Sequence, residues 1–145
     1  MGEYTAKKFS QLTSFGRDNL EVHAALRDDA DIFEIYTLAL GRETESMLRK
    51  YGKEIIGKQY VSKRLAEVAV DLFVGLSMLS RVNSLITSKG VENCKHELAI
   101  MRIFSRQARR RMNQQLRRVE KNEDPLMDEL ADYIFQEGKY TWDIL

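Results

Sequence analysis

The stretch KRLAEVAVDLFVGLSMLSR, from Lys63 to Arg81, decides the fold. Between residues 68 and 79 the apolar run is interrupted only by Asp71, Gly75 and Ser77. A helix that is apolar on nearly every side belongs at the centre of a bundle or in a membrane. The run is too short for a bilayer, which needs roughly 20 apolar residues. The stretch therefore predicts the central helix of a bundle, with Leu72 and Leu76 buried.

Signals on either side of this stretch predict three further helices. Asp31 can cap a helix start, and Gly52 provides a break after that helix. Gly90 suits the left-handed residue after a helix end, while Asp124 and Pro125 together mark a start. The expected helices cover residues 31–51, 54–88, 91–121 and 124–138, after a lead-in of residues 1–30 with short helical pieces. The last helix is expected to bury Leu126, Met127, Leu130 and Ile134, with Tyr133 as a further candidate. This pattern predicts an all-α, antiparallel four-helix bundle.

Composition places the chain among ordinary folded domains. Its 145 residues suffice for one domain, and 43% hydrophobic with 31% charged residues excludes a disordered chain. The net charge of +1 gives no overall attraction to nucleic acid. The single cysteine excludes an internal disulfide, and the first residues lack the apolar core of a secretory signal. We therefore expect a protein that is not secreted, and that lies in a reducing compartment or is indifferent to redox conditions.

Few residues suggest chemistry. His23 and His96 are far apart, so we expect no metal site, and no Gly-rich phosphate-binding motif occurs. Cys94 falls on an apolar stripe, where a thiol packs as a small hydrophobe. Asp71 is the one acid inside the apolar run, so it faces solvent or meets a basic group, for which Arg64 and Arg81 are candidates. A structural ion pair and a catalytic acid or base both remain open for it.

Charge is distributed unevenly near the end of the chain. Residues 89–121 carry a local charge of +7, whereas residues 122–145 carry −6. On a helix, most of the basic residues share a stripe about 120° wide beside the apolar one. We call this set the arginine face: Lys95, Arg102, Arg106, Arg109, Arg110, Arg117 and Lys121. Such a face suits anionic lipid, phosphate or an acidic partner, and it also suits a solvated surface beside the acidic last helix.

Residues 51–86, YGKEIIGKQYVSKRLAEVAVDLFVGLSMLSRVNSLI, carry a family resemblance through RLA, DL and LSR in this register. The similarity spans about residues 31–85. It resembles the extra C-terminal helical domain of very-long-chain acyl-CoA dehydrogenases, a family with bacterial and respiratory-assembly relatives. Only structural positions carry over onto this chain: Arg64, Leu65, Ala66, Asp71, Leu72, Leu79, Ser80 and Arg81. Leu76 joins them as an expected core residue.

The resemblance implies a docking domain rather than an enzyme. In that family a separate catalytic body binds FAD and acyl-CoA and supplies a glutamate base for fatty acid oxidation. No flavin ligand and no such glutamate carries over, so this chain alone is expected to be inactive and to bind no cofactor. Its expected partners are the rest of a dehydrogenase chain or its dimer mate, with peripheral contact to an anionic membrane. The resemblance also implies a location on the cytoplasmic or mitochondrial matrix side. The alternative is a free-standing helical adaptor whose arginine face binds an acidic protein or nucleic acid; an independent enzyme is a third reading.

Overall fold

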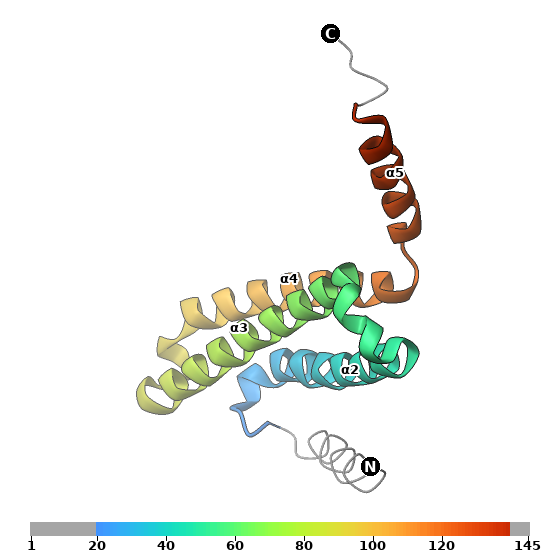
Figure 1. Ribbon diagram of the computed structural model, residues 1–145. Coiled ribbons are helices and arrows are strands. Elements are labelled where there is room, and N and C mark those ends of the chain that lie inside the picture. Colours follow the sequence, from blue (N-terminus) through green and yellow to red (C-terminus); the bar gives the residue numbers. More distant parts are fainter. Residues whose placement is uncertain (1–19, 140–145) are drawn as a thin grey trace, which may run out of the picture.

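The structure, a computed structural model, describes residues 20–139, and all its long elements are helices (Figure 1). The prediction of an all-α fold with four long helices is confirmed. The α-helices are α2 (Arg27–Tyr51), α3 (Gln59–Lys89), α4 (Lys95–Glu120) and α5 (Asp124–Glu137). Short 3-10 turns precede or join them: η1 (Ala24–Leu26), η2 (Gly52–Gly57) and η3 (Val91–Asn93). Within residues 20–139, no helix combines the length and apolar character needed to cross a membrane.

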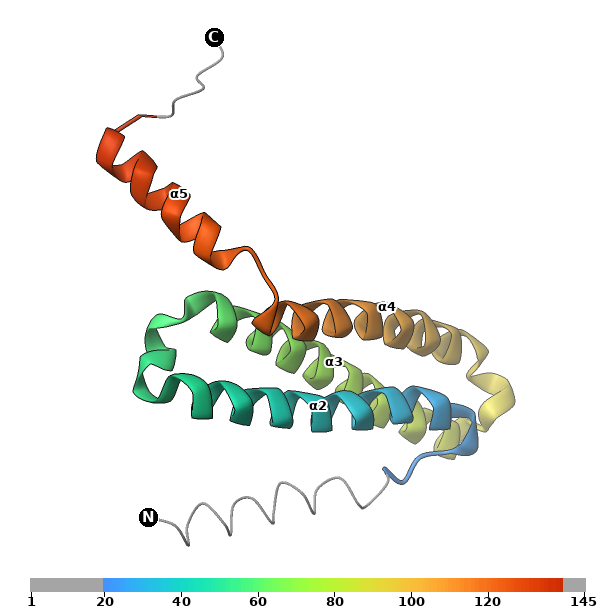
Figure 2. The same cartoon turned by 90° about the vertical axis from the view of Figure 1, so that its right-hand side faces the viewer.

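Helices α2, α3 and α4 form an antiparallel three-helix core, in which they lie side by side in both views (Figures 1 and 2). Fully buried residues from each helix meet in it, among them Phe33 of α2, Val68 of α3 and Met101 of α4. The ring of Phe33 stacks on that of Phe104, with centroids 6.5 Å apart. Cys94, at the start of α4, is also fully buried in this cluster.

Helix α2 begins at Arg27, earlier than the expected start at Asp31. Two acids, Asp28 and Asp29, occupy its first turn, where they interact favourably with the positive end of the helix dipole. Leu26 and Ala30 are fully buried in the core, so the end of the expected lead-in belongs to the bundle. The rest of that lead-in, residues 1–19, lies outside the described residues.

Helix α3 lies in the middle of the sequence and packs on both α2 and α4. Other helices do not surround it on every side. Leu72 is buried as expected, and Leu79 is buried as well, whereas Leu76 is only partly buried, which corrects its prediction. The outer side of α3 leaves Phe73 73% exposed and Val70 61% exposed. Two neighbouring helices cover only part of a helix surface, so an apolar residue on the third side stays open.

Helix α5 departs from the predicted packing. It points away from the three-helix core in both views and buries none of its residues (Figures 1 and 2). Of its expected buried side, Leu126 is 67% exposed, Leu130 53% and Met127 48%. The turn before α5 explains the direction, because the Asn122 side chain both accepts from the Asp124 backbone N–H and donates to carbonyls at the end of α4. The four helices therefore do not close into one bundle.

Candidate functional site

The arginine face lies on α4, on the side turned away from the buried residues of that helix. All seven of its members are exposed. The buried residues Met101, Ala108 and Met112 follow the neighbouring stripe of the helix at helical spacing. Lys121 lies one residue beyond the end of α4, so six members share the helix and the seventh continues from it. The arginine face is exposed because α4 is amphipathic: when the apolar stripe of such a helix is buried, its charged stripe faces solvent.

Most of the arginine face has no acidic partner within residues 20–139. Lys95 pairs with Glu92 at 3.2 Å, and this contact is largely exposed on both sides. Arg102, Arg106, Arg109, Arg110 and Arg117 make no ion pair in that range. The acidic α5, which could have neutralised them, points away instead (Figure 2). The face is therefore an uncompensated cationic surface in the described part of the chain.

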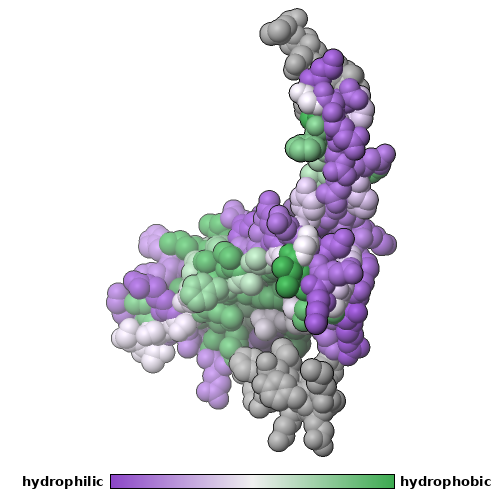
Figure 3. All heavy atoms as spheres, in the orientation of Figure 1, coloured by the Kyte–Doolittle hydropathy of each residue, from purple (hydrophilic) through white to green (hydrophobic). Residues whose placement is uncertain are grey.

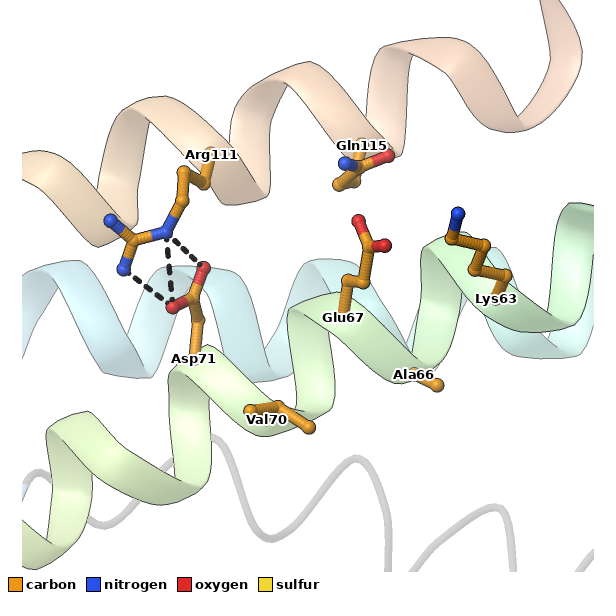
Figure 4. Close-up of a pocket in the computed structure, with 7 residues that line it drawn as sticks. All are labelled: Lys63, Ala66, Glu67, Val70, Asp71, Arg111 and Gln115. Atoms are coloured by element: carbon orange, nitrogen blue, oxygen red, sulfur yellow. Dashed lines mark hydrogen bonds and ion pairs between the residues drawn. The ribbon is translucent and has the colours of Figure 1, made fainter.

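Two arginines hold the helices together: Arg111, which the sequence reasoning missed, and Arg64, whose partner it did not identify. Arg111, just outside the arginine face, reaches across from α4 to Asp71 of α3, with Nη2 donating to Oδ1 at 2.6 Å and Nε donating to Oδ2 at 3.0 Å (Figure 4). Its guanidinium also lies 5.7 Å from the centroid of the Phe104 ring. Asp71 thus meets a basic group, but that group is Arg111 and neither Arg64 nor Arg81.

Arg64 is buried and pairs instead with Asp124 at the start of α5. Two parallel bonds join them, with Nη1 donating to Oδ2 at 2.6 Å and Nη2 to Oδ1 at 2.5 Å. The side chains are only 9% and 14% exposed. Hydrogen bonding to Arg64 holds the pKa of Asp124 below its ordinary value of 3.8, against the opposing effect of burial. The same bond raises the pKa of Arg64. A charged pair of this geometry positions the first residue of α5 on α3.

A groove of about 380 Å³ runs between α3 and α4 beside the Asp71–Arg111 pair. Figure 4 shows Lys63, Glu67 and Gln115 directed into the space between the two helices. Ala66 and Val70 supply its apolar lining. Such a shallow, solvent-open groove does not fit an FAD, since a cofactor site encloses most of its ligand and fixes the reactive ring with placed polar groups.

The remaining candidate residues are either structural or simply exposed. His23 caps η1, its Nδ1 accepting from the Ala25 backbone N–H at 3.1 Å, and His96 is exposed on α4. Buried Ser105 donates to the buried carboxylate of Asp29, which joins α4 to α2. Within residues 20–139 no three His, Cys, Asp or Glu side chains gather as a metal site would require. Arg81 is exposed and makes no ion pair in that range.

Comparison with protein families gives one match that covers most of the chain. Residues 24–140 match the family model described as the ACAD9/ACADV C-terminal domain. The matched region begins at η1 and includes every described helix. It therefore takes in the arginine face, the α3–α4 groove and the Arg64–Asp124 pair.

Proposed function

This chain belongs to the ACAD9/ACADV C-terminal domain family, and from that membership we propose that it is the non-catalytic docking domain of an FAD-dependent fatty acyl-CoA dehydrogenase. The dehydrogenase body supplies the flavin and the catalytic base. This domain covers that body or its dimer mate and attaches the assembly to an anionic membrane. The observation that carries the proposal is the arginine face, which is exposed and in which Lys95 alone makes an ion pair within the described residues.

The strength of such an attachment follows from the number of arginines. Each Arg or Lys close to an anionic leaflet contributes roughly 1 kcal/mol, so three or four acting together give weak and reversible binding. A rigid helix presents its arginines on one side, which lets several of them reach a flat surface together. Isolated exposed ion pairs contribute only about 0 to 1 kcal/mol each, so competing acids need not prevent this attachment.

Co-sedimentation with liposomes tests the membrane contact. The chain is expected to sediment with anionic vesicles at low salt, to be released by added salt and to ignore neutral vesicles. Changing Arg102, Arg106, Arg109 and Arg110 together to Gln should abolish sedimentation while nearly preserving helix propensity. The matched control changes four exposed cations elsewhere, Lys53, Lys58, Lys63 and Arg81, to Gln.

The control removes the same charge, so it separates a specific face from a general charge effect. If it loses binding as completely as the arginine-face variant, or if the unchanged chain ignores anionic vesicles, the membrane contact is refuted. Tighter binding to a DNA duplex or an acidic peptide than to vesicles would instead favour a helical adaptor.

A further inference from the structure

The first described residues of the chain lie at the boundary between α2 and α3. The backbone N–H of Leu20 donates to Oε1 of Glu34 at 2.7 Å, and its carbonyl accepts from Nη1 of Arg27 at 2.9 Å. The backbone N–H of His23 donates to Oδ1 of Asn83 at 2.8 Å. Since Glu34 and Arg27 belong to α2 and Asn83 to α3, the entering chain is held by both helices.

The same contacts give the direction of the chain ahead of Leu20. Arg27 and Glu34 lie about two turns apart on α2, so they share one flank of that helix. The amide of Leu20 meets Glu34, whereas its carbonyl meets Arg27, which is nearer the start of α2. Followed backwards, the chain therefore runs along this flank toward the end of α2 at Tyr51.

The facing flank of α3 is marked by Asn83 and becomes apolar further along. Leu65 lies about five full turns before Asn83, which puts it on the same flank, and Ala69 follows Leu65 by one turn. Leu65 is half-buried and Ala69 is exposed. Phe73, one turn beyond Ala69, borders this flank and is 73% exposed. Figure 3 shows hydrophobic side chains gathered over α3 on this outer side.

On α2 the corresponding residue is Leu38, one turn beyond Glu34 and half-buried. Gly75 lies against the Phe33 ring, and α2 and α3 are antiparallel, so Leu38 stands nearly level with Ala69 (Figure 2). Two half-buried leucines and an exposed alanine thus form an apolar floor between the two helices. We call this surface the α2–α3 seam: Leu38, Leu65 and Ala69.

The chain ahead of Leu20 is long enough to cover the seam. Its 19 residues would span about 28 Å as a helix, at 1.5 Å per residue. On the same measure, the distance from Glu34 to the end of α2 at Tyr51 is about 26 Å. The segment therefore matches the length of the open seam.

The same segment has a suitable apolar pattern. Phe9, Leu12 and Phe15 recur every three residues, a spacing that places them on one side of a helix. Lys7 and Arg17 fall on the other side. An amphipathic helix of this kind buries its apolar side against a neighbouring apolar surface and keeps its charges in water.

We propose that residues 4–15 pack into the α2–α3 seam of their own chain and complete the core as its fourth helix. Because the segment runs back from Leu20 beside α2, Phe15 comes nearest to Leu38 and Ala69, and Leu12 comes nearest to Leu65. The seam is then covered without a partner molecule, and α5 is not needed to close the core. The packing requires neither a membrane nor a dehydrogenase body, so it is tested apart from the proposed function.

Urea unfolding of the full chain tests the apolar side of the segment. Leu12→Ser with Phe15→Ser should raise the unfolding equilibrium constant at least about tenfold, because two large side chains lose a buried site. Lys7→Ser with Arg17→Ser is the matched control on the other side of the same segment. It should change that constant less than about threefold, as exposed positions do.

A charged side chain in the seam tests the receiving surface. Ala69 is exposed within residues 20–139, so Ala69→Arg should cost almost nothing if the seam is open to solvent. If residues 4–15 cover it, Ala69→Arg should raise the unfolding equilibrium constant at least about tenfold, because the charge cannot be buried beneath them. Thr87→Arg is the matched control, since Thr87 is exposed on the same flank about five turns further on and lies outside the seam.

A double-mutant cycle shows which part of the chain covers the seam. With Leu12→Ser and Phe15→Ser already present, Ala69→Arg should have little further effect, because the segment no longer packs there. Trypsin provides a second readout under native conditions. Cleavage after Lys8 and Arg17 should be at least about tenfold faster in Ala69→Arg than in Thr87→Arg, because only the first change releases the segment.

Three results would overturn the proposal. The first is a Leu12→Ser, Phe15→Ser chain as stable as its lysine and arginine control. The second is an Ala69→Arg chain as stable and as resistant to trypsin as Thr87→Arg, which is expected if the seam meets solvent or only a dehydrogenase body. The third is a pair of losses that simply add, which is expected if another segment covers the seam. Liposome binding can persist in each case, so the proposed membrane contact is judged independently.

Discussion

The ion pair between Arg64 and Asp124 fixes the first residue of α5 on α3 and so helps to define the shape of the molecule. Replacing Arg64 with Met keeps the length of the side chain but leaves the Asp124 carboxylate without its donor. The free energy of unfolding should fall by about 1–3 kcal/mol, the range for a hydrogen bond to a charged group that loses its partner. Urea titration measures this change. Arg81→Met on the same helix is the control and should cost less than about 0.5 kcal/mol, because Arg81 is exposed and unpaired within residues 20–139. Equal losses of unfolding free energy in both variants would contradict a stabilising role of the Arg64–Asp124 pair.

The same pair makes stability depend on pH in a defined direction. The folded state holds the pKa of Asp124 below its ordinary 3.8, mainly through hydrogen bonding to Arg64. A lowered folded pKa stabilises the protein above the unfolded pKa, and this stabilisation disappears as the pH falls through the folded value. The difference in unfolding free energy between wild type and Arg64→Met should therefore be full near pH 6 and shrink below about pH 4.

The sequence could show that Arg64 and Asp71 need partners but could not choose those partners. Both are charged residues on or beside the apolar run of α3, where a lone charge is costly. Arg64 and Asp71 lie seven residues apart on nearly one face, which made them plausible partners for each other. The actual partners, Asp124 and Arg111, are 60 and 40 residues away along the chain. Only the packing of α3 against α4 brings these residues together.

At the scale of elements, the close crossing of α2 and α3 rests on Gly75. A Cβ at this position would overlap the fully buried ring of Phe33. In an open helix, replacing Gly with Ala is stabilising by about 0.5–1 kcal/mol. Here the overlap should dominate, and Gly75→Ala should destabilise the fold by about 1–3 kcal/mol in thermal or urea unfolding. Gly57→Ala is the control, because nothing lies within 4 Å of its added Cβ. A stabilised Gly75→Ala protein would show that the helices can separate at little cost.

The number and type of helices were predictable because each has a strong local signal. Asp124 and Pro125 marked the start of α5, although the Asp124 carboxylate binds Arg64 instead of capping the helix, and the apolar run marked α3. Which sides of these helices are covered was not predictable from periodicity, since an apolar stripe on Leu126 and Leu130 looks alike whether it packs within the chain or on a partner. The same limit applies to α3, where Phe73 is exposed and Leu76 only partly buried although the apolar run predicted cover on nearly every side.

At the scale of the whole molecule, the three-helix core should fold without α5. A chain that ends after Asp124 keeps the partner of Arg64 and loses no buried residue of the described structure. Its unfolding free energy should match that of the full chain within about 0.5 kcal/mol, measured by denaturant titration at low protein concentration so that association does not contribute. A loss of several kcal/mol would mean that α5 stabilises its own core after all.

The arginine face was predictable as a set of residues, and the structure adds its lack of acidic cover within residues 20–139. The sequence left open whether the acidic last helix lies beside it. Charge attraction alone favoured that arrangement. The turn at Asn122 and the Arg64–Asp124 pair send α5 in another direction, because short-range hydrogen bonds with fixed geometry outweigh screened attraction between exposed charges.

Because Cys94 is buried, the reactivity of its thiol measures how often the structure opens around it. It is the only thiol in the chain and is fully enclosed where η3 leads into α4. A disulfide reagent in solution can reach the sulfur only while the hairpin of α3 and α4 is apart. The rate at which the thiol is modified under native conditions thus reports how often α3 and α4 separate locally. No engineered label is needed for this measurement.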